Sequence, residues 1–164
     1  MRLGSDLGPS VELEVLGYEF PRADKRTDVW TANWLDIRGR IRLADGRTWD
    51  FTHPCLTTFE AAQLGAWLHS VSSDDESVLS RMGTDRKVPR VFLTEPLLAF
   101  EAEPTSKTGF DISVILNLEA LPPWEPWEER IGDEDFVVTV AVTRPDLDRV
   151  EAQWSQACAR FPER

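Results

Sequence analysis

Helical periodicity occurs in only two segments of this chain, and this restricts the folds that the chain can adopt. The first segment spans residues 56–71 and carries Thr57 and Glu60 at the spacing of a capping box. The second spans residues 143–161, where Pro145 stands in the first turn and apolar residues recur at helical spacing. The remaining regular patterns are strand-like, so we expect a sheet protein with two helices.

Alternation of apolar and polar residues predicts the strands. The pattern is clearest at residues 110–118, where every second residue is apolar. Gly46 predicts a hairpin, because glycine accepts the positive φ of a tight turn. Pro54 is expected to end the strand that follows this hairpin, since proline lacks an N–H donor. The predicted strands cover residues 11–15, 34–43, 47–52, 91–93, 97–103, 110–118 and 136–142.

Consecutive strands joined by short turns favour antiparallel pairing. We therefore predict an α+β domain in which a mainly antiparallel sheet of about six or seven strands has two helices packed on one face. This single domain should span residues 10–164 and follow a flexible N-terminal tail at residues 1–9. The polar segment 71–89 is expected to be a mobile loop, because long loops in small domains are commonly mobile or functional.

The charge of the chain limits its partners. Asp and Glu number 29 against 18 Lys and Arg, which gives a formal net charge of -11. Nucleic acids are bound by clustered lysines and arginines, so we expect no nucleic-acid partner. A basic protein would instead be attracted to such a chain. Acidity also serves solubility alone, and charge by itself does not decide between these two interpretations.

Residues that commonly carry catalysis are scarce, with two His and two Cys in the whole chain. His53 and Cys55 lie close in sequence, but in a strand their side chains need not converge, and a zinc site needs three or four convergent ligands. We therefore expect no catalytic residue, no metal site and no cofactor, and we expect Cys55 and Cys158 to be buried free thiols. An enzyme or small-ligand protein remains an alternative that a deep pocket with a buried carboxylate pair would favour.

The termini and the apolar runs bear on location. The first ten residues lack the apolar region of a secretory signal, and no apolar run approaches the ~20 residues of a membrane span. We expect a cytoplasmic protein with no membrane partner.

The most unusual stretch is 122–135, which combines tryptophans with acidic residues. Tryptophan is enriched at the energetic centres of interfaces, and an acidic rim suits a basic partner. In the alternative interpretation, Trp124 packs back onto the edge of the sheet and the acids are simply solvated. The candidate partner-binding residues are Trp124, Trp127, Glu128, Glu129, Asp133 and Glu134.

Four blocks of the sequence carry a resemblance to a known family. They are residues 13–21, 30–35, 49–57 and 159–164, and Glu95-Pro96 and Pro122-Pro123-Trp124 accompany them. These blocks resemble the WapI-type immunity protein family. The resemblance covers nearly the whole domain in matching order, and strings such as Phe-Thr-x-Pro-Cys-Leu are unusual. The chain departs from the family's usual pattern at His53 and in its long segment 70–90.

The resemblance implies a small cytoplasmic antitoxin that protects a bacterium from the C-terminal toxin domain of a contact-dependent polymorphic toxin. Such toxins are often nucleases with basic surfaces, which agrees with the acidic charge of this chain. We interpret the matching blocks as positions that determine the fold, so we transfer no partner-binding residue from the family to this chain. The alternative is a non-catalytic protein-binding or regulatory domain whose partner is not a toxin.

Overall fold

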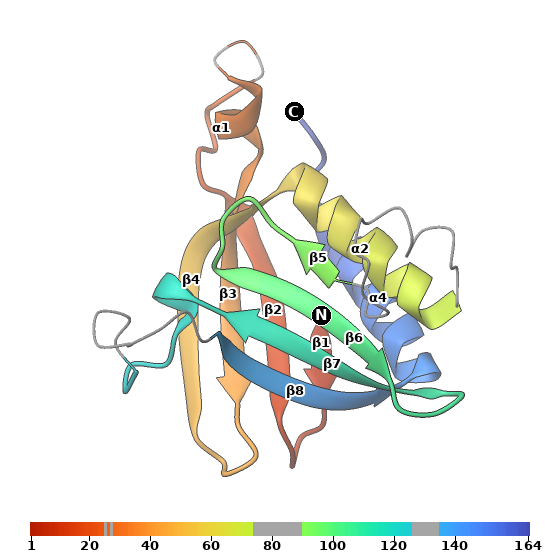
Figure 1. The fold of residues 1–164 in the computed structure, drawn as a ribbon. Coiled ribbons are helices and arrows are strands. Elements are labelled where there is room, and N and C mark those ends of the chain that lie inside the picture. Colours follow the sequence, from red (N-terminus) through yellow and green to blue (C-terminus); the bar gives the residue numbers. More distant parts are fainter. Residues whose placement is uncertain (25, 27, 74–89, 126–134) are drawn as a thin grey trace.

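The computed structural model describes residues 1–24, 26, 28–73, 90–125 and 135–164 (Figure 1). Its strands form two antiparallel sheets of four strands each. Within each sheet, every strand pairs with the strand that follows it in the sequence. The first sheet contains β1 (Arg2–Gly4), β2 (Ser10–Tyr18), β3 (Trp34–Arg42) and β4 (Thr48–Thr57). The second sheet contains β5 (Arg90–Phe92), β6 (Leu98–Pro104), β7 (Gly109–Leu116) and β8 (Phe136–Thr143). The helices are α1 (Val29–Asn33), α2 (Thr58–Ser73) and α4 (Arg144–Cys158), and η1 (Leu118–Ala120) is a single 3-10 turn.

The α+β class and the antiparallel pairing are confirmed, but the expectation of one sheet with six or seven strands is wrong. The polypeptide leaves β4 through α2 rather than through a hairpin, so β5 does not continue the first sheet and starts the second. Alternation within a strand shows which residues face a core, but it does not show which sheet the strand joins.

Both sheets turn one face toward a common hydrophobic core, to which α2 and α4 contribute (Figure 1). Strand β8 contacts β1 and β2, so the sheets meet along one side. Helices α2 and α4 pack against each other; α4 also contacts β1, β2 and β8, while α2 contacts β4 and β5. The helices therefore bridge the two sheets rather than cover one face of a single sheet. The largest fully buried side chains are Trp67, Trp154 and Phe100.

Residues 2–4 were expected to lie in a flexible tail, but they form β1. Leu3 is fully buried, and the backbone N–H of Leu13 donates a hydrogen bond of 2.9 Å to the carbonyl oxygen of Met1. The strand has three residues and one buried apolar side chain, which is too short for a period-two pattern to be visible in the sequence.

Pro54 does not end its strand, because β4 continues to Thr57. The register against β3 shifts between Leu35 and Asp36, where Pro54 faces Asp36 and Leu56 faces Leu35. Strand β4 is the edge of the first sheet, and an edge strand tolerates proline at a position where no N–H is required. The bulge also turns the chain toward α2.

Both predicted long helices are confirmed, and each begins with a reciprocal capping box. At the start of α2, the backbone N–H of Thr57 donates to Glu60 at 2.8 Å, and the backbone N–H of Glu60 donates to the Thr57 hydroxyl at 3.2 Å. Thr143 and Asp146 make the equivalent pair at the start of α4. The one-turn helix α1, capped by Asp28, lies just before the predicted strand 34–43, in residues for which we predicted no element. Within the described ranges, no helix is long and apolar enough to span a membrane.

Candidate partner-binding site

Trp124 packs onto the edge of the first sheet and remains 37% exposed. Its ring meets the ring of Trp49 on β4 edge-on, with centroids 5.5 Å apart, and the Arg47 guanidinium lies 4.9 Å from the Trp124 centroid. The segment after β7 makes this possible, because η1 turns the chain back across β4. For Trp124 the structure therefore agrees with the alternative interpretation, in which this residue packs on the sheet edge. This packing leaves part of the indole exposed to a partner.

Trp49 is the residue that holds this corner together. Its indole N–H donates a hydrogen bond of 3.0 Å to the carbonyl oxygen of Ala120, and its ring meets Phe136 at the start of β8 at 5.6 Å. Trp49 is only 7% exposed, so the contact is part of the core. It fixes the position of the polypeptide on both sides of the segment predicted to bind a partner.

The other candidate residues, Trp127, Glu128, Glu129, Asp133 and Glu134, lie outside the described residues. Asp135, which follows them, has one carboxylate oxygen 3.7 Å from the Arg90 guanidinium and accepts a hydrogen bond from the amide of Asn117 at 3.4 Å. The described residues that flank these five candidates in sequence are therefore Glu125 and Asp135.

The outer face of the first sheet carries charges of both signs that pair across strands. Arg40 on β3 lies 2.8 Å from Glu12 and 3.5 Å from Glu14 on β2, and Arg38 lies 3.5 Å from Glu14. Opposite charges at facing positions stabilise antiparallel strands modestly. The acidic and basic side chains of this group pair with each other, so the acidic excess of the chain is not concentrated on this face.

His53 and Cys55 both lie on β4 but differ in burial and in the groups around them. His53 is half-buried, with Nε2 4.0 Å from a carboxylate oxygen of Glu119, whereas Cys55 is fully buried in the core. Burial raises the pKa of the Cys55 thiol to about 12 and that of Cys158 to about 11. Both thiols are therefore neutral and weakly nucleophilic at physiological pH. Among the described residues, no group of three or more His, Cys, Asp or Glu side chains could hold a metal ion.

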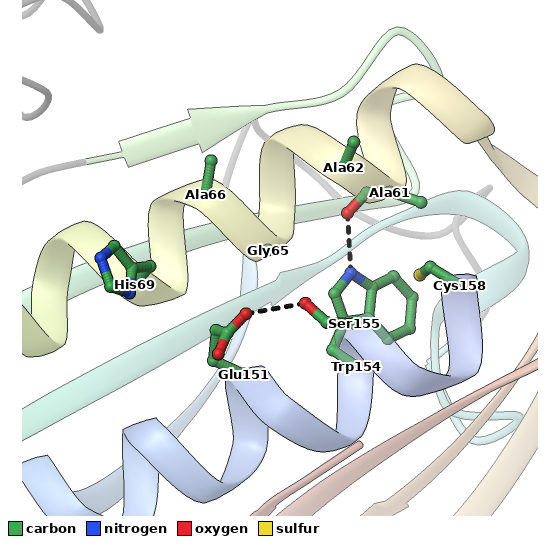
Figure 2. A pocket seen from close by; sticks show the side chains of 9 residues that line it. All are labelled: Ala61, Ala62, Gly65, Ala66, His69, Glu151, Trp154, Ser155 and Cys158. Carbon is green, nitrogen blue, oxygen red and sulfur yellow. Dashed lines mark hydrogen bonds between the residues drawn. The ribbon is translucent and has the colours of Figure 1, made fainter. Parts of the chain in front are cut away.

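A shallow groove of about 400 Å³ runs between α2 and α4 (Figure 2). Its floor is Trp154, whose indole N–H donates a hydrogen bond of 2.7 Å to the carbonyl oxygen of Ala61. Gly65 faces this ring, and a Cβ there would lie 3.5 Å from it, which is an ordinary van der Waals contact. Glu151 and Ser155 bond to each other on the side of α4 at 2.7 Å. The groove is a consequence of close helix packing through small residues, and no buried carboxylate pair lines it.

Sequence reasoning missed a clamp at one end of the molecule, where the last residues hold the segment between β2 and β3. The Arg164 guanidinium donates hydrogen bonds to the carbonyl oxygens of Phe20, Pro21 and Ala23 at 3.1 to 3.3 Å. It also lies 3.3 Å from the centroid of the Tyr18 ring, and the Tyr18 hydroxyl donates to the carbonyl oxygen of Pro162. No local pattern could have shown it, because the partners are more than 140 residues apart. Two of the four blocks that carried the resemblance, residues 13–21 and 159–164, meet in these contacts, which supports their interpretation as fold determinants.

Comparison with known proteins gives one match. A family model described as "Immunity protein WapI-like family" matches residues 2–162 of the 164-residue chain. No curated protein and no solved structure matches.

Proposed function

Since this chain belongs to the immunity protein WapI-like family, we propose that it is a cytoplasmic antitoxin that binds the C-terminal toxin domain of a contact-dependent toxin. The observation that carries the proposal is the family match, which spans residues 2–162. An immunity protein has a toxin as its partner, so the binding of a protein rather than the turnover of a substrate is the expected activity.

The proposed mechanism is masking of the toxin's active surface. The chain has a net charge of -11, and a domain with this charge attracts a basic protein, such as a nuclease, and accelerates the encounter. The raised thiol pKa values agree with a role that needs no nucleophile, because both cysteines are protonated at neutral pH.

We further propose that the segment from Trp124 to Glu134 contacts the toxin. Trp124 supplies a rigid aromatic surface, and a partly exposed indole that is already held in place loses little side-chain entropy on binding. Trp127, Glu128, Glu129, Asp133 and Glu134 would add a second tryptophan and an acidic rim.

The function is tested by co-expression and by direct binding. The probe is the C-terminal domain of the toxin encoded beside this gene, inactivated for the binding measurement. We expect growth rescue of cells that express the active toxin, and a complex whose affinity falls as salt rises. Failure to rescue growth together with no measurable complex would overturn the proposal and favour a different protein partner.

The segment is tested separately with the triple charge reversal Glu128→Lys, Glu129→Lys and Glu134→Lys. We expect at least a tenfold loss of affinity that is largely due to slower association. Full affinity of this variant, with wild-type protein still binding, would exclude the segment as the contact surface while leaving the function intact.

A further inference from the structure

The outer face of the second sheet differs from that of the first. Alternation along the strands turns one set of side chains away from the core, and contacts between neighbouring strands agree with this assignment. Ser113 and Thr139 lie 3.3 Å apart across β7 and β8, and Arg90 lies 3.0 Å from Glu101 across β5 and β6. The outward set is Arg90, Phe92, Ala99, Glu101, Glu103, Asp111, Ser113, Ile115, Val137, Thr139 and Ala141.

An apolar row crosses all four strands of this face. The register places Phe92 opposite Ala99, Ala99 opposite Ile115, and Ile115 opposite Val137. The central members are buried, but Phe92 and Val137 at the two ends are 57% and 46% exposed. The apolar area that this row offers to a partner is therefore that of Phe92 and Val137, because Ala99 and Ile115 are only 8% and 3% exposed.

Next to this row, two carboxylates face each other. Glu103 on β6 is the register partner of Asp111 on β7. Side chains at directly opposite positions have Cβ atoms about 5 Å apart, and like charges placed there destabilise the pair of strands. Within the described part of the chain, neither carboxylate takes part in an ion pair, in contrast to Glu12 and Glu14 on the first sheet.

The balance of charge on this face is negative. Arg90 is its one described cation, and it is already shared between Glu101 and Asp135 at 3.0 and 3.7 Å. The Arg90 guanidinium also lies 4.4 Å from the centroid of the Phe92 ring. The face therefore combines an apolar row with an acidic pair that no described cation of this protein compensates.

We propose that the outer face of the second sheet docks the toxin, with its apolar row against an aliphatic patch and Glu103 and Asp111 together receiving a lysine or arginine of the toxin. This inference rests on the proposed function and names the surface that carries it. A basic side chain between Glu103 and Asp111 removes the repulsion that the free protein sustains. Phe92 and Val137 supply exposed apolar area that a partner can bury.

The acidic pair is tested with Glu103→Lys and Asp111→Lys, and with the milder Asp111→Asn. Affinity for the inactivated toxin domain is measured by calorimetry and surface plasmon resonance at low and high salt. We expect each reversal to weaken binding at least tenfold, chiefly through slower association, and the loss to shrink at high salt. The matched control is Asp50→Lys, which makes the same charge change on the outer face of the first sheet and should bind within twofold of wild type.

Asp111→Asn has a second readout that a structural role would not give. Relief of the like-charge pair should raise the urea midpoint of the free protein while affinity for the toxin domain falls. If the variant is more stable than wild type but binds the toxin domain less tightly, position 111 serves binding rather than stability. Lower stability together with unchanged affinity would overturn the role of the pair.

The apolar row is tested with Phe92→Ser and Val137→Ser, both at exposed positions. These variants should fold as wild type by circular dichroism, and they should dissociate from the toxin domain at least tenfold faster with little dependence on salt. Wild-type affinity in both serine variants and both charge reversals would overturn the docking surface while leaving the proposed function standing. Absence of binding by the wild-type protein would overturn the proposed function, and the docking surface with it.

Discussion

The side chain of Asn33 and the backbone of Arg164 hydrogen-bond to each other across 131 residues of sequence. The backbone N–H of Arg164 donates to Asn33 Oδ1 at 3.0 Å, and Asn33 Nδ2 donates to the carbonyl oxygen of Arg164 at 3.3 Å. Asn33 is fully buried, and it also accepts from the Thr58 hydroxyl at 2.9 Å and donates to the carbonyl oxygen of Val29 at 2.7 Å. One amide thereby joins α1, the start of α2 and the last residue of the chain.

Asn33→Ala should lower the free energy of unfolding by about 1–3 kcal/mol, because buried polar partners are then left unsatisfied. Deleting Arg164 should cost less, and the double variant should lose less than the sum of the two single losses. Urea unfolding of the four proteins measures this coupling. Arg164→Ala is the matched control, since it keeps both backbone bonds to Asn33 and removes only the side-chain contacts. Strict additivity of Asn33→Ala and the deletion would contradict the clamp.

Gly39→Ala should destabilise the first sheet by about 1–3 kcal/mol through overpacking. The Phe51 ring lies over Gly39, and a Cβ at that position would come within 2.2 Å of it. Gly17→Ala is the control, because nothing lies within 4 Å of a Cβ there, and its effect should stay within about 0.5 kcal/mol. Thermal unfolding of the two variants compares the sites directly, and equal melting temperatures would show that the Phe51 ring moves freely.

Trp124→Ala and Trp30→Ala separate stability from binding. Both indoles are partly exposed, at 37% and 50%, and each meets one aromatic ring edge-on, Trp49 for Trp124 and Phe59 for Trp30. Each substitution should cost at least about 0.5–1.5 kcal/mol of stability through the lost ring pair. Only Trp124→Ala should also weaken binding to the toxin domain, measured by calorimetry. Equal affinities of the two variants would assign Trp124 a purely structural role.

The capping box of α4 should make stability depend on pH in the acid range. Hydrogen bonds from Thr143, and then from Arg149, hold the pKa of Asp146 below its ordinary value of 3.8. A carboxyl with a lowered pKa stabilises the folded state at neutral pH, and that contribution is lost as the pH falls through the pKa of the folded state. The contribution is at most about 1 kcal/mol, because the Asp146 side chain is partly exposed to solvent.

Asp146→Asn should therefore be less stable than wild type at pH 7, and the difference should shrink below pH ~4. Asp148→Asn removes the same charge from the same helix without breaking the capping box, so it serves as the control. Urea unfolding at pH 7 and pH 3 makes the comparison. A difference between wild type and Asp146→Asn that grows toward acid would contradict the assigned sign.

The two thiols should react slowly in the folded protein. With pKa values of about 12 for Cys55 and about 11 for Cys158, the thiolate fraction at pH 8 is on the order of 10⁻⁴ and 10⁻³. Alkylation by iodoacetamide should be at least roughly 100-fold slower than in urea, with Cys55 the slower because it is fully buried. Mass spectrometry of the time course identifies the site, and fast labelling of Cys55 under native conditions would contradict its burial.

The elements that the sequence predicted correctly are those whose physical cause is local. Thr57 and Glu60 lie one helical turn apart, so their capping box depends on contacts over three residues and α2 follows from it. Residues 109–116 alternate because one side of β7 faces the core, and the alternation is visible without knowing what that core contains.

Other features depended on contacts between distant residues. Strand β1 exists because Leu3 is buried against the rest of the core, and three residues show no periodicity of their own. Pro54 is tolerated because β4 is an edge strand, which is a property of the sheet and not of the residue. The division into two sheets was hidden for the same reason, since α2 separates β4 from β5 and only packing decides where β5 pairs.

The candidate site likewise combines features that were visible in the sequence with features that depend on contacts between distant residues. The aromatic and acidic composition of 122–135 marked it in the sequence, but the packing of Trp124 on Trp49 required the fold to bring residues 75 positions apart into contact. The facing of Glu103 and Asp111 likewise depends on the register of β6 against β7. The sequence determined the two long helices, seven of the eight described strands, the net charge and the family, because these follow from residue identity and short spacing. Only the tertiary structure decided the two sheets, the Asn33–Arg164 clamp and the acidic face, because each depends on which distant strands and segments pair.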